Sequence, residues 1–106
     1  MAFATDNDLS AAIQAFLRQV VHGRLADLWT SDGPTRIAAD YIEKGSPLSH
    51  GEHLLLQVAF DLWNGQGRAT LADLLGVLDD ANLRAVLDLI TLARPGIAQA
   101  RTPARR

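Results

Sequence analysis

Cysteine is absent from the 106 residues of this chain. Its absence excludes disulfide bonds, thiolate metal ligands and cysteine nucleophiles. A chain without cysteine fits a reducing compartment, and residues 1–8 have neither the basic region nor the apolar region of a secretory signal. We therefore expect a cytoplasmic protein.

Long apolar runs are also missing. The most apolar stretch, residues 54–63, has only about half of the roughly 20 residues that a helix needs to cross a bilayer. No segment alternates apolar and polar residues over the length of a strand, and no glycine-rich phosphate loop follows a predicted strand. These absences predict a helical protein without a membrane span or a nucleotide fingerprint.

Positive charge is scarce in the body of the chain. Residues 1–95 carry seven arginines and lysines against twelve aspartates and glutamates, a net charge of −5. Arg101, Arg105 and Arg106 then add three positive charges and bring the total to −2. Because nonspecific binding of nucleic acid depends on clustered cations that neutralise phosphates, the acidic body argues against nucleic acid as a partner.

What the sequence does contain is a strongly marked helix at residues 49–64. Ser49 and Glu52 have the spacing of a capping box, and Gly65 stands where a glycine commonly ends a helix. Only two polar residues interrupt the apolar run of residues 54–63. A helix with so little polar surface must be surrounded by other helices, so we predict that it forms the centre of the fold.

Four further helices are predicted from the helical spacing of apolar residues and from capping signals. The first starts at the capping-box spacing of Thr5 and Asp8 and continues past a weak point at Gly23. The last is expected to end at Pro95-Gly96. We expect these helices at about residues 5–30, 34–44, 70–78 and 79–94.

Together these elements predict an all-α fold, a compact five-helix bundle with irregular packing because the helices differ greatly in length. Residues 1–96 are expected to form a single helical domain, and residues 97–106 a short basic flexible tail. The predicted core follows from the apolar faces of the helices. It consists of Phe16, Leu17, Val20, Trp29, Leu54, Leu55, Val58, Ala59, Leu62, Leu74, Leu78, Leu83, Val86, Leu87 and Ile90.

His50, His53 and Asp61 share the polar strip of the central helix and come closest to a set of metal ligands. The two histidines are three residues apart, whereas the metalloprotease motif needs a spacing of four. We therefore interpret the strip as a solvated face and expect no metal and no cofactor. Since Ser49 and Thr70 are explained as helix caps, we also expect no catalytic residue and no enzymatic activity.

The surplus of apolar residues predicts a surface for association. We expect Val21, Leu25, Leu56, Phe60 and Trp63 to remain partly exposed in a monomer and to form that surface. The leading hypothesis is a non-enzymatic protein–protein interaction or regulatory module that acts through a helical face, as a homodimer or other homo-oligomer.

The alternative hypothesis is a DNA-associated transcriptional regulator. The helix pair at residues 70–94 has the arrangement of a helix-turn-helix, and its contacts with DNA would come from Arg84, Arg101, Arg105 and Arg106. The outer side of the second helix, however, offers mainly aspartates instead of the arginine, lysine, asparagine and glutamine side chains that read bases. This charge favours the first hypothesis.

Overall fold

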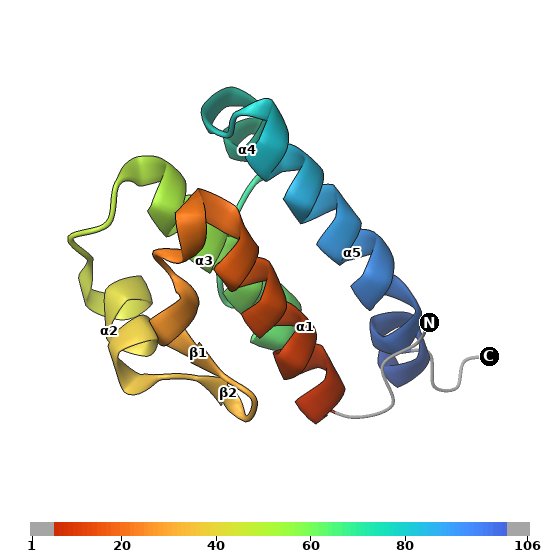
Figure 1. Cartoon of the computed structure of the whole chain (residues 1–106). Coiled ribbons are helices and arrows are strands. Elements are labelled where there is room, and N and C mark those ends of the chain that lie inside the picture. Colours follow the sequence, from red (N-terminus) through yellow and green to blue (C-terminus); the bar gives the residue numbers. More distant parts are fainter. Residues whose placement is uncertain (1–5, 102–106) are drawn as a thin grey trace.

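The computed structural model describes residues 6–101, with side chains from residue 8 to residue 93. Within this part, five α-helices pack around one core, which confirms the predicted all-α fold (Figure 1). None of these helices has the length and apolar character needed to span a bilayer. The helices are α1 (Asp6–Gln19), α2 (Arg36–Lys44), α3 (His50–Asn64), α4 (Leu71–Val77) and α5 (Asp80–Arg101). The short elements between α1 and α2 are two 3₁₀ turns, η1 (Val20–Gly23) and η2 (Ala26–Leu28), and two strands, β1 (Trp29–Thr30) and β2 (Gly33–Pro34).

Helix α3 is the centre of the fold, as predicted. It contacts α1, α2, α4 and α5, and Leu54, Leu55 and Leu56 on consecutive positions are all fully buried. Its capping box is formed by Ser49 and Glu52, and Gly65 ends the helix in the left-handed conformation with φ 77°. In Figure 1, α1 crosses in front of α3, and α5 runs alongside α1.

The first helix is shorter than predicted. Instead of continuing as a helix, the chain reverses in η1, where Val21, His22 and Gly23 have φ values of 43°, 57° and 78°. Left-handed backbone is unfavourable for residues with a Cβ, so the reversal needs compensation from packing. That compensation comes from Leu25 and Trp29, which the reversal places in the core with 0% and 1% exposure.

The segment after η1 is a small hairpin rather than a helix start. Strand β1 pairs with β2 in antiparallel register, with Thr30 opposite Gly33. Pro34 therefore lies in β2, not in the first turn of a helix as predicted. The side chain of Thr35 caps α2 by accepting a hydrogen bond from the backbone N–H of Ala38, at 3.1 Å.

Trp29 holds the hairpin to α1 and α3. Its indole N–H donates to the Ser10 hydroxyl oxygen at 2.9 Å, and that hydroxyl donates to the carbonyl of Thr30 at 2.7 Å. The ring meets Phe60 and Trp63 edge to face, with centroids 5.3 Å and 5.9 Å apart. Every polar atom that Trp29 and Ser10 bring into the core thus has a partner.

Helix α5 corrects the predicted helix end. It continues through Pro95 and Gly96 to Arg101, whereas the division into a domain of residues 1–96 and a tail of residues 97–106 stays a prediction. A proline removes one backbone hydrogen bond, and a helix of 22 residues keeps the others. The predicted start signal at Thr5 and the tail residues 102–106 lie outside the described residues.

The face that α5 buries also differs from the prediction. Ala85, Val86, Leu89 and Ala93 are buried. Two alanines on that face let α5 approach α1 closely, so large side chains are not required there. Of the other predicted core residues, Leu62, Leu78 and Leu83 are partly buried against the core, and Leu87 and Ile90, with 49% and 38% exposure, are not core residues.

The hydrogen bond between Ser10 and Trp29 gives a first test of the fold. Ser10→Ala leaves the indole N–H without its acceptor inside the core, so we expect the free energy of unfolding to fall by about 2 kcal/mol. Urea denaturation followed by tryptophan fluorescence measures the change. Ser31→Ala, at an exposed position of the hairpin, is the control and should shift the stability by less than about 0.5 kcal/mol. Equal effects of the two substitutions would contradict this account.

Candidate functional site

Among the described residues, most of the exposed large apolar side chains belong to one stretch of the sequence, which forms α4 and the first half of α5. Among the described residues, seven large apolar side chains are exposed, and six of them belong to residues 71–92. Leu71 and Leu75 on α4 are the most exposed, at 76% and 71%. We call this region the α4–α5 surface; it is defined by Leu71, Leu75, Val77, Leu87, Ile90 and Leu92.

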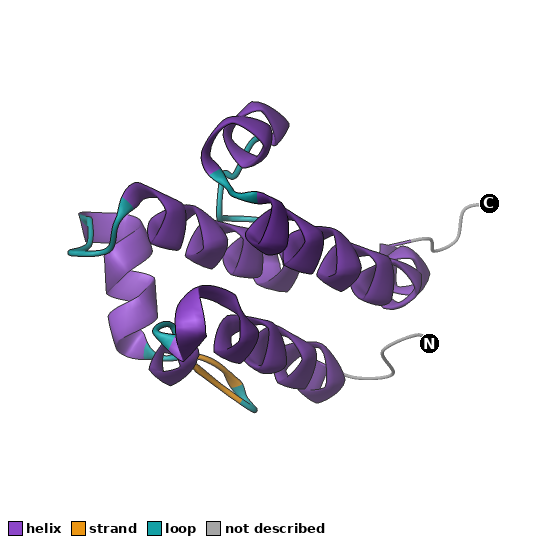
Figure 2. Ribbon diagram, turned by 45° about the horizontal axis from the view of Figure 1, so that its top comes forward, coloured by secondary structure: helices purple, strands orange, loops and turns teal. Residues whose placement is uncertain are grey.

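Helix α4 projects from the body of the molecule, which is why its leucines reach solvent. Figure 2 shows this short helix standing away from the others, joined by loops to α3 and α5. Of its residues only Leu74 is buried, while Val77 lies beside Gly51 at the start of α3. Leu71 and Leu75 are four residues apart and therefore share one side of the helix.

The α4–α5 surface is acidic. Asp73, Asp79, Asp80 and Asp88 are all exposed, and Arg84 is the one basic residue between positions 69 and 93. Asp79 caps α5 by accepting a hydrogen bond from the backbone N–H of Asn82 at 2.8 Å. In residues 69–93, exposed apolar side chains and exposed aspartates therefore occur together.

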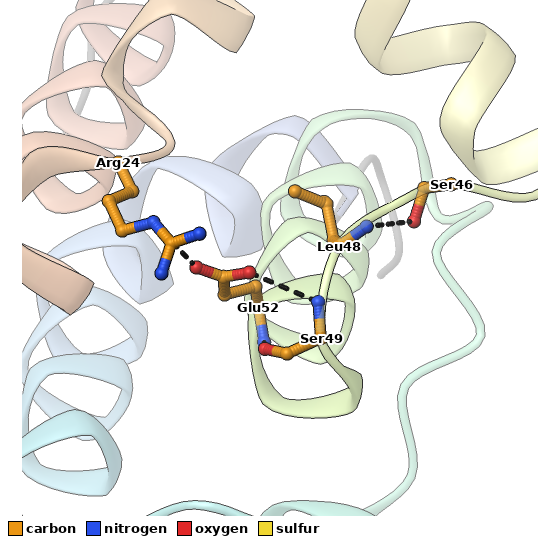
Figure 3. Close-up of polar contacts among 5 residues, drawn as sticks. All are labelled: Arg24, Ser46, Leu48, Ser49 and Glu52. Carbon is orange, nitrogen blue, oxygen red and sulfur yellow. Dashed lines mark hydrogen bonds and ion pairs between the residues drawn. The ribbon is translucent and has the colours of Figure 1, made fainter.

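A second group of polar residues forms hydrogen bonds and an ion pair between elements of the fold. The Glu52 carboxylate accepts the backbone N–H of Ser49 at 3.0 Å and pairs with the Arg24 guanidinium at 3.2 Å (Figure 3). The hydrogen bond from Ser49 is the main reason that the pKa of Glu52 lies below its ordinary value of 4.5, and the nearby charge of Arg24 adds to the effect, against desolvation by burial. This network connects the turn after α1 to the start of α3, so its role is structural.

The polar strip of α3 is more than a solvated face. His53 Nδ1 lies 3.1 Å from the hydroxyl of Ser46, and the Asp61 carboxylate accepts the backbone N–H groups of Arg68 and Ala69, both at 2.8 Å. His50 is exposed. In the described part of the chain, no three histidine, aspartate or glutamate residues gather as metal ligands.

The bonds to Asp61 shape a pocket of about 750 Å³ between α2, α3 and the loop that follows α3. Arg68 adopts a positive φ of 62°, and the backbone of Gly67 packs directly on the backbone of α3. The lining offers apolar, amide and charged groups. It consists of Ala39, Ile42, Glu43, Gln57, Phe60, Asn64, Gly65, Gln66, Gly67 and Arg68.

Three of the five apolar residues predicted to form an interaction surface are buried. Leu25, Leu56 and Phe60 are buried, with at most 5% exposure, and Val21 and Trp63 are partly buried against the core. The cause is the reversal in η1, which folds the hairpin over α3. Sequence patterns missed the exposed leucines of α4 because their helical spacing is also that of a core-facing stripe. The shortness of the segment was the feature of the sequence that could have indicated their exposure, since a helix of seven residues buries little apolar surface.

The arginines of the alternative hypothesis are placed only in part. Arg84 is exposed on α5, and the backbone of Arg101 is the last of that helix. Arg105 and Arg106 lie outside the described residues. Comparison with protein-family models, with curated proteins and with solved structures gives no match. The chemistry of this chain alone therefore decides between its candidate sites.

The loop that forms the pocket gives a prediction on stability. A Cβ on Gly67 would overlap the carbonyl oxygen of Gln57, so Gly67→Ala should destabilise the protein by about 2 to 3 kcal/mol in urea denaturation. Gly76→Ala in α4 is the matched control, because nothing lies within 4 Å of the added methyl group. It should stabilise by about 0.5 to 1 kcal/mol. If both substitutions have the same sign, the described loop geometry is wrong.

The lowered pKa of Glu52 predicts how stability depends on pH. A carboxyl group with a depressed folded pKa stabilises the protein above its unfolded value of 4.5, and this contribution is lost as the pH falls through the folded value. Glu52→Gln removes the charge, so the variant should be less stable than the wild type at pH 7, and the difference should shrink below pH 4.5. Urea denaturation at several pH values measures it. Glu43→Gln, at an exposed position, serves as the control; a difference for Glu52→Gln that does not change with pH would contradict the assignment.

Proposed function

We propose that this protein is a non-enzymatic interaction module that binds another protein chain through the α4–α5 surface. The observation that carries the proposal is the concentration of six exposed large apolar side chains within residues 71–92. Burying one such side chain is worth about 1.5 to 3 kcal/mol relative to leaving it in water. A partner that covers several of them gains enough for specific association, and soluble monomers rarely leave such a region bare.

The arrangement of the helices supports this proposal. Because α4 projects from the body, a partner can approach Leu71 and Leu75 without displacing any core residue. The apolar groups of α4 and of α5 follow helical spacing, which is the pattern that another helix recognises when it docks along a helical face.

The charge of the surface supports a protein partner over DNA. Exposed Asp80 and Asp88 on the outer side of α5 would face phosphates in a helix-turn-helix complex, and Arg84 is the only basic residue among residues 69–93 that would oppose that repulsion. A DNA-associated role remains the second hypothesis, and the experiment below separates the two.

A double variant of the α4–α5 surface tests the proposal. We would recover tagged wild-type protein, Leu75→Gln/Leu87→Gln and Ile37→Gln from extract of the source cell after nuclease treatment, and identify bound chains by mass. Ile37 is 57% exposed on α2, so Ile37→Gln is a matched control outside the surface. We expect one stoichiometric protein with the wild type and the control, and at least tenfold less with the double variant, since two apolar contacts are lost.

Self-association is measured in parallel by sedimentation equilibrium of the three purified proteins. A wild-type dimer that dissociates in the double variant alone would also support the proposal. A monomer that retains no chain would refute the proposed function, as would retention that depends on intact nucleic acid.

A further inference from the structure

We propose that two copies of this chain form a dimer by exchanging helix α1, so that α1 of each copy packs on the core of the other. The exchange straightens the turn η1 and leaves the rest of each copy as it is. The inference is independent of the proposed function, because it rests on the backbone of η1 and on the contacts of α1 instead of the α4–α5 surface.

The turn η1 has an unfavourable backbone. Val21, His22 and Gly23 have consecutive positive φ values of 43°, 57° and 78°, and Val21 and His22 are two of the three non-glycine residues with positive φ in the described chain. A left-handed residue that has a Cβ lowers an equilibrium constant by a factor of about 5 to 30, and valine, which is β-branched, rarely adopts this conformation. Straightening η1 removes this cost from each copy.

The packing of α1 keeps the turn in this conformation. Ile13, Phe16 and Leu17 are buried, with at most 4% exposure, and α1 contacts β1, α3 and α5. Within the described residues, α1 is joined to the rest of the fold by η1 alone (Figure 1). The α1 of a second copy has the same side chains and fits the same place. Exchange therefore keeps the burial of α1 and releases the strained turn, which is the condition that favours swapped dimers.

The hydrogen bonds of α1 are also kept in the exchanged dimer. The Ser10 hydroxyl accepts the indole N–H of Trp29 and donates to the carbonyl of Thr30. The side-chain amide of Gln14 donates to the carbonyl of Trp29 at 3.1 Å. These bonds join α1 to β1, which lie on opposite sides of η1. In the exchanged dimer they connect two different chains.

The sequence around η1 is compatible with a straight chain. The helical spacing of apolar residues continues past Gly23 to Leu25 and Trp29, which is why the sequence predicted a longer first helix. If only residues 21–23 change conformation, Leu25 and Trp29 keep their buried places. Joining two copies costs translational and rotational freedom, so the exchanged dimer is favoured at high protein concentration.

Two variants of η1 should change the amount of dimer in opposite directions. Each protein is refolded from urea at millimolar concentration, and sedimentation velocity measures the ratio of dimer to monomer. Gly23→Ala adds a Cβ to the left-handed run, 3.3 Å from the carbonyl oxygen of Arg18, and should raise this ratio by at least about tenfold. Val21→Gly/His22→Gly makes the turn favourable and should lower the ratio by at least about tenfold.

Gly65→Ala is the matched control for Gly23→Ala. Gly65 has a φ of 77°, close to that of Gly23, and nothing lies within 4 Å of an added Cβ. It ends α3, so the exchange of α1 does not relieve the backbone cost of the substitution. Gly65→Ala should destabilise the protein and leave the ratio of dimer to monomer unchanged. A rise equal to that of Gly23→Ala would overturn the inference.

Nuclear Overhauser contacts show which chain each α1 packs on. The dimer is refolded from equal amounts of chain labelled with heavy nitrogen and chain labelled with heavy carbon. The bond between Ser10 and Trp29 predicts a contact from the indole N–H of a nitrogen-labelled chain to the Ser10 side chain of a carbon-labelled chain. A dimer in which this contact occurs only within one chain has not exchanged α1, and the inference is then wrong.

These outcomes are distinct from those that test the proposed function. Leu75 and Leu87 are exposed in the single chain, so the exchanged dimer should persist in Leu75→Gln/Leu87→Gln, whereas a dimer formed through the α4–α5 surface should dissociate. If the wild type and Gly23→Ala both remain monomers after refolding at millimolar concentration, α1 does not exchange and the inference fails. The recovery experiment above then still decides the proposed function.

Discussion

The enclosure of α3 is the constraint on which the rest of this structure depends. Three consecutive leucines in one helix point in directions about 100° apart, so no single neighbour buries them all. The chain covers them with helices on several sides and with the hairpin between α1 and α2. The unfavourable backbone of η1 is part of this solution, because the reversal brings Leu25 and Trp29 over α3.

The burial of α3 also brings polar atoms into the core, and nearby residues provide their hydrogen-bond partners. The Ser10 hydroxyl accepts a hydrogen bond from the Trp29 indole. The Glu52 carboxylate accepts a hydrogen bond from the backbone N–H at the start of α3 and forms an ion pair with the Arg24 guanidinium. An unpaired polar group in the core costs more than a typical hydrogen bond contributes, so these pairs define where α1 and η1 sit relative to α3. They account for the burial of Ser10 and Glu52.

Capping residues in the sequence correctly predicted helix ends, because hydrogen bonds between neighbouring residues determine where a helix starts and stops. The caps at Ser49 and Thr70 and the stop at Gly65 mark α3 and α4 where the structure has them. The reversal at η1 was not predictable, because Val21 is a residue that rarely adopts positive φ and only tertiary packing holds it there. The buried side of α5 was missed because small Ala85 and Ala93 pack more closely than the larger residues beside them. The exposed side of α4 was missed for a related reason, since spacing alone cannot show which side of a short helix has a neighbour.

Because α4 is short, the proposed binding of a partner would depend on whether this helix is formed. Seven residues are too few to sustain a helix in water, and Leu74 is its one buried anchor. Its backbone amides therefore belong to the part of the fold that opens first, well before the core around α3 unfolds. A chain that covers Leu71 and Leu75 binds only the formed helix, so occupancy protects α4 against opening. Under the proposed function, association and the folding of this one helix would therefore be a single coupled equilibrium.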